Sequence, residues 1–326
     1  MPPEARAVSE TEASLQIRAA WLAYVGGYTQ EEIAERLGLS RVKAHRLIAA
    51  ALQSGRVKVF VEGEEAQCLA LEDELKARFH LSHCTVVLDA ARPGSPESAD
   101  ELDALGVGGA QVLYRLMQKA GAVSIGVGHG RTLASVAEHL PHLPRPDLKF
   151  VSLIGSLTRK SSANPFDVIS RLAERTGGEG YFLPVPFIAD TEADAEVLRA
   201  QRGVQTVLGL AHACELCVVG VGVLGAHGNL LHSGMLTAAE QAALEARGAV
   251  GDLLGHFLDR DGQVVDHEVN RRALGVRLDQ MRGRQVLAVV GGIHKVPAIL
   301  AALRSGYLTG LVVNESTAQR LVSQGG

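Results

Sequence analysis

The sequence is poor in cysteine, and it has no long uninterrupted apolar run. Four cysteines among 326 residues are too few for the disulfide framework that small secreted domains need. The longest apolar stretches have the length of a strand and are broken by glycines, well short of the roughly 20 residues that cross a membrane. The N-terminal residues also lack the apolar segment of a signal peptide. These absences favour a cytoplasmic protein that does not enter a membrane.

Common catalytic and metal-binding motifs are missing as well. The chain has no HExxH pair, no GxSxG elbow and no Walker A ending. Cys214 and Cys217, with His212 nearby, have a spacing that suggests a metal or redox centre. However, no second Cys or His pair follows at ligand spacing, and Cys217 runs directly into an apolar strand. We interpret both as buried structural thiols and expect no metal and no other cofactor.

The distribution of charge is uneven along the chain. A net charge of −4 argues against a protein that coats nucleic acid without specificity. Yet the segment 36–61 contains no Asp or Glu, although it carries Arg and Lys at positions 36, 41, 43, 46, 56 and 58. A basic segment in an otherwise acidic protein is the electrostatic footprint that DNA phosphates require.

The same region has the pattern of a helix-turn-helix. A first helix ends at Gly26-Gly27. Thr29 and Glu32 then form a capping-box pattern, which predicts the start of a second helix. Gly38 ends that helix, and Ser40 caps a third helix that runs to about residue 54. Residues 56–61 alternate like a short strand or wing.

In this layout the third helix enters the major groove of DNA with its N-terminal half. The side chains that we expect at the DNA are Thr29, Gln30, Ser40, Arg41, Lys43, His45 and Arg46. The alternative is a small helical packing module whose basic residues only contact solvent. The agreement of caps, turn glycine, apolar face and charge favours the DNA-reading interpretation.

The rest of the chain predicts a larger α/β domain with a mostly parallel sheet. Hydrophobic residues make up 47% of the chain, and continuous apolar runs alternate with helical patterns, which is typical of strands covered on both faces. We predict a flexible tail (1–12), a helix-turn-helix domain (13–62), a linker helix (63–80) and an effector domain (81–326). The expected strands are 84–88, 122–127, 150–154, 216–223, 286–290 and 309–313.

A glycine-rich turn at 124–132 (SIGVGHGRT) joins a strand to a helix. Such a turn lets backbone N–H groups approach an anion or a group of hydroxyls, and Arg131 adds a fork of donors. The candidate effector-binding residues here are Gly128, His129, Gly130, Arg131 and Thr132. Close packing explains many glycine-rich turns equally well, so the turn alone does not establish a site.

Other polar residues follow neighbouring strands and are expected at the same edge of the sheet, where open α/β sheets bind ligands. Gly155 follows the 150–154 strand, Lys295 follows 286–290, and Glu315 follows 309–313. Lys295 has two interpretations, a ligand contact or a solvated surface lysine. Asp252 likewise either accepts hydrogen bonds from sugar hydroxyls or caps a helix.

Several blocks of the sequence resemble the SorC family of sugar-responsive transcriptional regulators, in the family's order. They begin with YTQEEIAERLGLSRVKAHRLIAAALQSGRVKV and continue through nearly the whole chain as GVGHGRTLASV, FVSLIGSLTR, ANPFDVISRLAERTG, VGDLLGHFLDRDG and VVGGIHKVPAILAALRSGYLTGLVVNESTA. LSRVKAHRLIA, IGVGHGRTL, ANPFDV and VPFIADT are most similar to the branch that controls erythritol breakdown.

The resemblance implies a fold like that of ribose-phosphate isomerase and an effector that is a sugar, a polyol or a phosphate of one. It also implies that the glycine-rich turn, Asp252 and Lys295 lie near this effector. One departure is Asn314-Glu315, where the family commonly has Asp-Glu, so a ligand role for position 314 is in doubt.

Together these observations predict a repressor that binds operator DNA as a homodimer or tetramer and has no enzymatic activity. Two alternatives remain. In one, the crevice is an isomerase-like active site and the helical segment is accessory. In the other, the α/β domain is only an assembly platform.

Overall fold

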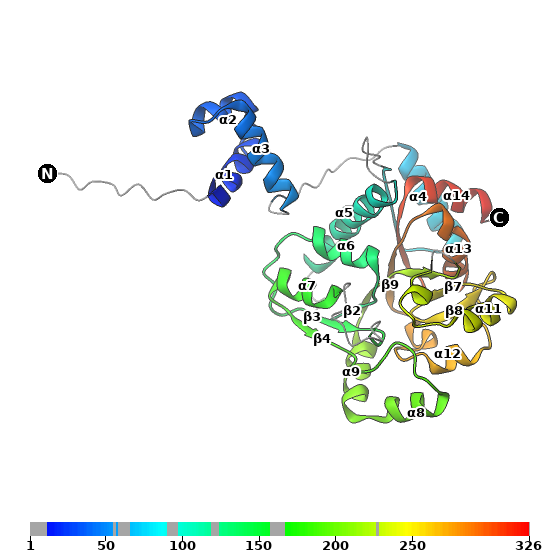
Figure 1. Ribbon diagram of the computed structural model, residues 1–326. Coiled ribbons are helices and arrows are strands. Elements are labelled where there is room, and N and C mark those ends of the chain that lie inside the picture. The colour runs from blue at the N-terminus through cyan, green and yellow to red at the C-terminus, as the bar shows by residue number, and fades with distance from the viewer. Residues whose placement is uncertain are drawn as a thin grey trace. The chain divides into compact units, whose positions relative to one another are not determined.

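A computed structural model describes residues 12–54, 57, 66–89, 97–118, 124–156, 167–225 and 228–325. The chain divides into two compact units, Met1–Val61 and Glu62–Gly326. Figure 1 shows both units, each of which is considered by itself below.

The described part of the smaller unit, residues 12–54 and 57, contains three helices: α1 (Glu12–Tyr24), α2 (Gln30–Leu37) and α3 (Arg41–Gln53). Gly38 ends α2 in the left-handed conformation, with φ of 62°, a value that glycine adopts without steric cost. Buried apolar side chains of all three helices then meet in one small core: Ala19, Ile33, Ala34, Ala44, Leu47 and Ile48. The predicted helix-turn-helix pattern therefore corresponds to a packed three-helix unit.

The larger unit is built on a seven-stranded sheet in which every strand pair is parallel. The strand order is β1-β10-β9-β5-β2-β3-β4. The strands are β1 (His83–Val87), β2 (Ser124–Val127), β3 (Lys149–Ser152), β4 (Glu179–Tyr181), β5 (Leu216–Val219), β9 (Gln285–Val289) and β10 (Gly310–Asn314).

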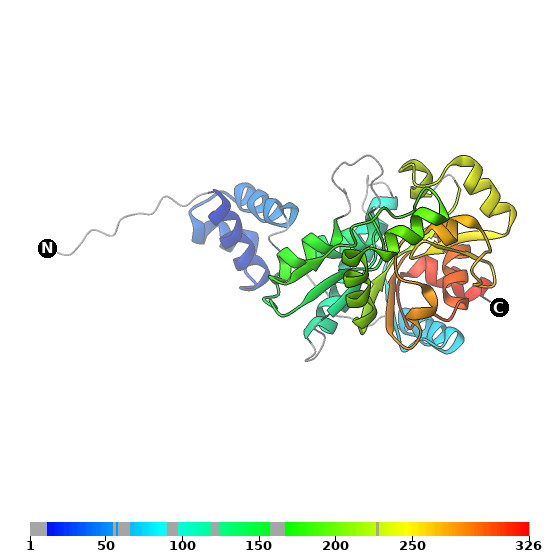
Figure 2. The same ribbon diagram turned by 90° about the horizontal axis from the view of Figure 1, so that it is seen from below.

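Helices cover both faces of this sheet (Figures 1 and 2), so successive residues of β5 and β10 are all buried. The longer ones are α4 (Ala66–Phe79), α5 (Glu97–Gln118), α6 (Arg131–His139), α7 (Val168–Thr176), α8 (Glu192–Ala200), α9 (Arg202–Ala213), α11 (Ala238–Ala246), α13 (Val296–Arg304) and α14 (Glu315–Gln324). Two shorter ones are α10 (Asn229–His232) and α12 (Glu268–Arg272).

A second, antiparallel sheet contains β6 (Val221–Val223), β7 (Ala249–Leu253) and β8 (His256–Asp259), in that order. The single strand expected at 216–223 is therefore wrong, because the run divides at Gly220 into β5 and β6, which belong to different sheets. The apolar pattern cannot show that the chain passes from one sheet to another, because both strands are apolar. The sequence pattern also missed β4, β7 and β8.

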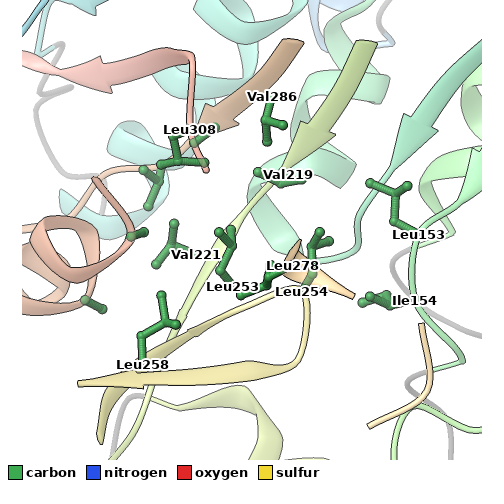
Figure 3. Packing of buried hydrophobic residues seen from close by; sticks show 14 of the residues in the cluster. Leu153, Ile154, Val219, Val221, Leu253, Leu254, Leu258, Leu278, Val286 and Leu308 are labelled. Carbon is green, nitrogen blue, oxygen red and sulfur yellow. The ribbon is translucent and has the colours of Figure 1, made fainter. Parts of the chain in front are cut away.

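The main core of the larger unit extends from the parallel sheet into the small sheet. Val219 of β5, Val221 of β6 and Leu253 of β7 belong to one buried cluster with Ile154, which follows β3. Figure 3 shows these side chains gathered in one region, so the small sheet is fixed against the edge at which the parallel strands end.

The helix α4 packs within the larger unit. It contacts β1 and α14, and Leu75 on it is fully buried. The guanidinium of Arg78 donates a hydrogen bond of 2.6 Å to the carbonyl oxygen of Val322. Among the described residues, no helix is long and apolar enough to cross a bilayer.

The four cysteines are buried free thiols, which confirms the interpretation of Cys214 and Cys217. Burial raises the pKa of Cys214 to about 11, and it raises the pKa of Cys84 and Cys217 to about 12. A protonated, shielded thiol is a poor nucleophile.

We therefore expect Ellman's reagent to react with these cysteines at least tenfold more slowly in the native protein than in urea at pH 8. The measurement is the absorbance of the released thiolate with time. Rapid reaction of native thiols would contradict the buried positions.

Candidate DNA-reading surface and effector site

The outer face of α3 presents a row of exposed polar side chains. Arg41, Lys43, His45 and Arg46 are exposed, whereas Ala44 faces the core. The hydroxyl of Ser40 accepts a hydrogen bond of 3.3 Å from the backbone N–H of Lys43, so its side chain starts the helix. The predicted cations are thus held on one side of a rigid helix.

The start of α2 adjoins this row. Thr29 caps α2: its hydroxyl accepts from the N–H of Glu32, and its own N–H donates to the Glu32 carboxylate at 2.8 Å. Gln30 extends toward α3, where its amide nitrogen lies 3.0 Å from Nδ1 of His45. All seven residues predicted at the DNA therefore belong to the first turn of α2 or the first half of α3, or cap these helices. The expected wing lies outside the described residues, apart from Val57.

Val42 is a surface residue that the sequence reasoning missed. Its side chain is 78% exposed in the middle of the polar row, between Arg41 and Lys43. The one apolar group in the major groove is the methyl group of thymine, so Val42 is a further candidate for contact with DNA. The sequence contained one signal for it: Val42 is apolar but does not belong to the apolar face of the third helix.

The larger unit contains a cavity at the carboxyl ends of β2 and β5. It holds about 870 Å³ of empty space, including the part open to solvent. Seven of the nine predicted effector residues line it: Gly128, His129, Gly130, Arg131, Thr132, Asp252 and Lys295. Residues that are separated by more than 160 positions in the chain thus meet in one place.

The glycine-rich turn opens directly into the N-terminus of α6. Gly130 has φ of 128°, a conformation that side chains disfavour, and it gives α6 no side-chain cap. The first N–H groups of α6 are therefore available to an anion. Arg131 is exposed at the first helical position, and Nε2 of His129 lies 3.2 Å from the hydroxyl of Ser152.

Asp252 is held on the cavity wall by two close contacts. Its Oδ2 accepts a hydrogen bond of 3.1 Å from the N–H of Gly255. Its Oδ1 occupies the space where a Cβ at Gly222 would lie, so only glycine fits opposite it on β6. Burial raises the pKa of Asp252 to about 6, although the Gly255 hydrogen bond and Lys295 both favour the ionised form.

Lys295 supplies the opposite charge. It lies in the short 3-10 turn Ile293–Lys295, immediately before α13. Burial lowers the pKa of its ammonium, and repulsion from Arg131 lowers it further, while Glu101 and Asp252 act against this. The side chain is thus partly buried and lines the cavity, which differs from the solvated lysine that the sequence left open.

Two predicted effector residues do not line the cavity. A Cβ at Gly155 would lie 2.2 Å from the carbonyl oxygen of Pro186, and its N–H donates to the carbonyl of Leu274, so it serves backbone packing. Glu315 begins α14 and accepts a hydrogen bond from Gln319.

Asn314, the departure from the family pattern, is fully buried at the end of β10. Its amide nitrogen donates to Asp89 at 2.8 Å and to Glu101 at 2.9 Å. The amide therefore joins β10 to the segment after β1 and to α5, which is a structural role.

The sequence reasoning also missed the apolar side of the cavity. Ile154, Phe187, Leu230 and Leu254 line it, and each is at most 9% exposed. Phe187 lies in the block VPFIADT and Leu254 in VGDLLGHF, so the blocks that carried the family resemblance contained a signal for both.

Comparison with known proteins identifies the chain. Residues 64–323 match the family model described as "Putative sugar-binding domain". The chain is 42% identical over 317 residues to the erythritol catabolism regulatory protein EryD of Brucella abortus, covering 97% of this chain and 99% of that protein. The chain belongs to the SorC family of sugar-binding transcriptional regulators.

Other SorC-type proteins agree with this assignment. The transcriptional regulator LsrR of Klebsiella pneumoniae is 33% identical, with 96% of this chain and 94% of that protein covered. The full-length sorbitol operon regulator SorC of Klebsiella pneumoniae is similar in structure, with a TM-score of 0.73 and 25% identity over 94% of this chain and 98% of that chain. These relatives are regulators rather than enzymes, so the isomerase-like alternative is set aside.

The raised pKa of Asp252 predicts a pH-dependent cost to stability. Well below pH 3.8 the carboxyl is neutral in both the folded and the unfolded protein and costs nothing. As the pH rises from 4 to 6 the unfolded chain ionises first, so stability is lost, by about 3 kcal/mol for a pKa raised from 3.8 to about 6. Asp252→Asn removes this cost.

The measurement is urea unfolding of wild type and Asp252→Asn at pH 4, 5.5 and 7.5. The stability gained by the variant is expected to grow with pH to about 3 kcal/mol. Glu245→Gln, which removes a charge from an exposed position, is the control. A gain that is the same at every pH would contradict the burial of Asp252.

Proposed function

We propose that this protein represses an operon for the breakdown of a short polyol and that a phosphate ester of that polyol releases it from DNA. One observation carries the proposal: the open N-terminus of α6, Arg131, Asp252 and Lys295 line the same cavity. The helix end and the two cations suit a phosphate, and the carboxylate suits hydroxyl groups.

The choice of a polyol rests on the relatives. EryD, at 42% identity over almost the whole chain, is named for erythritol catabolism. SorC, whose structure is similar, is named for the sorbitol operon. We infer an erythritol-derived effector for this chain, and we infer that the protein acts in the cytoplasm, where its operator lies.

DNA binding is proposed to use the smaller unit, residues 13–62, with α3 in the major groove. Helix-turn-helix proteins bind two half-sites about 34 Å apart, or multiples of this, so we propose a homodimer or tetramer. Residues 63–80 would link this unit to the effector domain, 81–326. The effector then acts by binding more tightly to the arrangement of subunits that has low affinity for the operator than to the arrangement that binds the operator.

Loss of a cation from α3 is expected to weaken operator binding. Lys43→Ala and Arg46→Ala should each raise the Kd about tenfold, because a base or phosphate contact contributes about 1–3 kcal/mol. The Kd is measured by fluorescence anisotropy at fixed salt, with DNA from the promoter region of the gene that encodes this protein. Arg320→Ala removes the same charge from an exposed site on the larger unit and should bind like wild type. Unchanged affinity in both α3 variants would refute the docking model.

Loss of Arg131 is expected to weaken effector binding while leaving operator binding unchanged. Arg131→Ala should bind D-erythritol 4-phosphate about tenfold more weakly or worse, since charge-assisted hydrogen bonds contribute about 1.5–3 kcal/mol. Because Arg131 is exposed, the variant should fold and bind operator DNA normally. Isothermal titration with the ester gives the Kd. If no polyol or polyol phosphate binds the wild type, the larger unit is an assembly platform instead.

A further inference from the structure

The cavity is lined by two chemically different groups of side chains. Arg131, Asp252 and Lys295 are charged, whereas Ile154, Phe187, Leu230 and Leu254 are apolar, and we call these four the apolar wall. The four wall residues come from four separate segments, and each is at most 9% exposed although it lines a cavity. The wall is thus part of the packed core, and it cannot move aside without loss of packing.

Leu254 holds an unusual backbone conformation in this wall. Leu253 pairs with His256, so Leu254 and Gly255 alone form the turn between β7 and β8. Both have positive φ, 52° and 79°, a combination that favours Asn-Gly and disfavours leucine. A leucine kept at such a position is held there by its surroundings and often has a functional reason.

Two contacts keep this turn in place. The N–H of Gly255 donates to Asp252, which lines the same cavity. On the other side, the ring of Phe187 lies where a Cβ at Gly255 would be, with its nearest atoms at 2.8 Å. The turn is therefore fixed between a carboxylate that lines the cavity and another wall residue, and Leu254 is fixed with it.

The wall side chains offer a ligand no hydrogen bond. A hydroxyl pressed against them gives up its bonds to water without replacement, which is unfavourable. A polyol carries a hydroxyl on every carbon, so each added carbon adds a hydroxyl that must either find a polar partner or lie against an apolar side chain. The penalty therefore increases with chain length.

We propose that the apolar wall limits the length of the effector and that Leu254 determines this specificity. This inference rests on the proposed function, because it takes a polyol phosphate to be the effector. The wall admits a four-carbon chain held by its phosphate at α6 and rejects five- and six-carbon chains.

The test measures Kd by isothermal titration for D-erythritol 4-phosphate, D-ribitol 5-phosphate and D-glucitol 6-phosphate. Wild type is expected to bind the four-carbon ester at least tenfold more tightly than the others. Leu254→Gly removes the side chain and suits the positive φ, so it should fold. It should bind the five-carbon ester at least tenfold more tightly than wild type does.

Leu230→Ala shortens a wall side chain that comes from another element, α10, and so enlarges the cavity. It should also tighten binding of the five-carbon ester, which guards against a fold defect in Leu254→Gly. Leu258→Ala is the matched control: Leu258 lies in the same small sheet and is buried, but it does not line the cavity. It should lose stability and keep the preference for four carbons.

The outcomes separate the two proposals. Equal binding of the three esters by wild type, or an unchanged preference in both Leu254→Gly and Leu230→Ala, overturns the length limit and leaves the proposed function standing. If wild type binds none of the esters, the proposed function fails and the length limit fails with it.

Discussion

The effector site depends on one constraint, a carboxylate and an ammonium held where little water reaches them. Asp252 and Lys295 both lose hydration in the fold, and each shifts toward its neutral form as a result. Their mutual attraction offsets part of this cost. Hydroxyls and a phosphate in the cavity would replace the lost water, which supports the proposal of an occupant that carries both groups.

The glycines around the site make this arrangement possible for different reasons. Gly222 leaves room for the Asp252 carboxylate, whereas Gly130 permits the bend that points the N-terminus of α6 into the cavity. Gly155 looks the same in the sequence but only allows the chain to pass Pro186. A sequence shows where glycines are, and only the fold shows which neighbour each one accommodates.

The sequence predicted much of the fold because its strongest signals are local. The caps at Thr29 and Ser40 and the turn at Gly38 define the smaller unit without reference to the rest of the chain. The parallel strands other than β4 were found because burial on both faces makes them continuously apolar. The edge strand β4 was missed because it is short and largely exposed. The hairpin of β7 and β8 was missed because its strands are short, and its turn has leucine where turn chemistry predicts asparagine. The apolar wall was missed because its residues are ordinary core residues in the sequence, and only tertiary contacts bring them to the cavity.

The amide of Asn314 has a consequence for charge balance beyond its own hydrogen bonds. With aspartate there, the residue common in the family, three carboxylates would meet at the ends of β1 and β10 and would compete for the nearest cation. Glu101, one of the two acids that Asn314 binds, already attracts the ammonium of Lys295. The neutral amide donates a hydrogen bond to each of the two acids. Asparagine at position 314 therefore adds no further negative charge beside Glu101 to compete for Lys295.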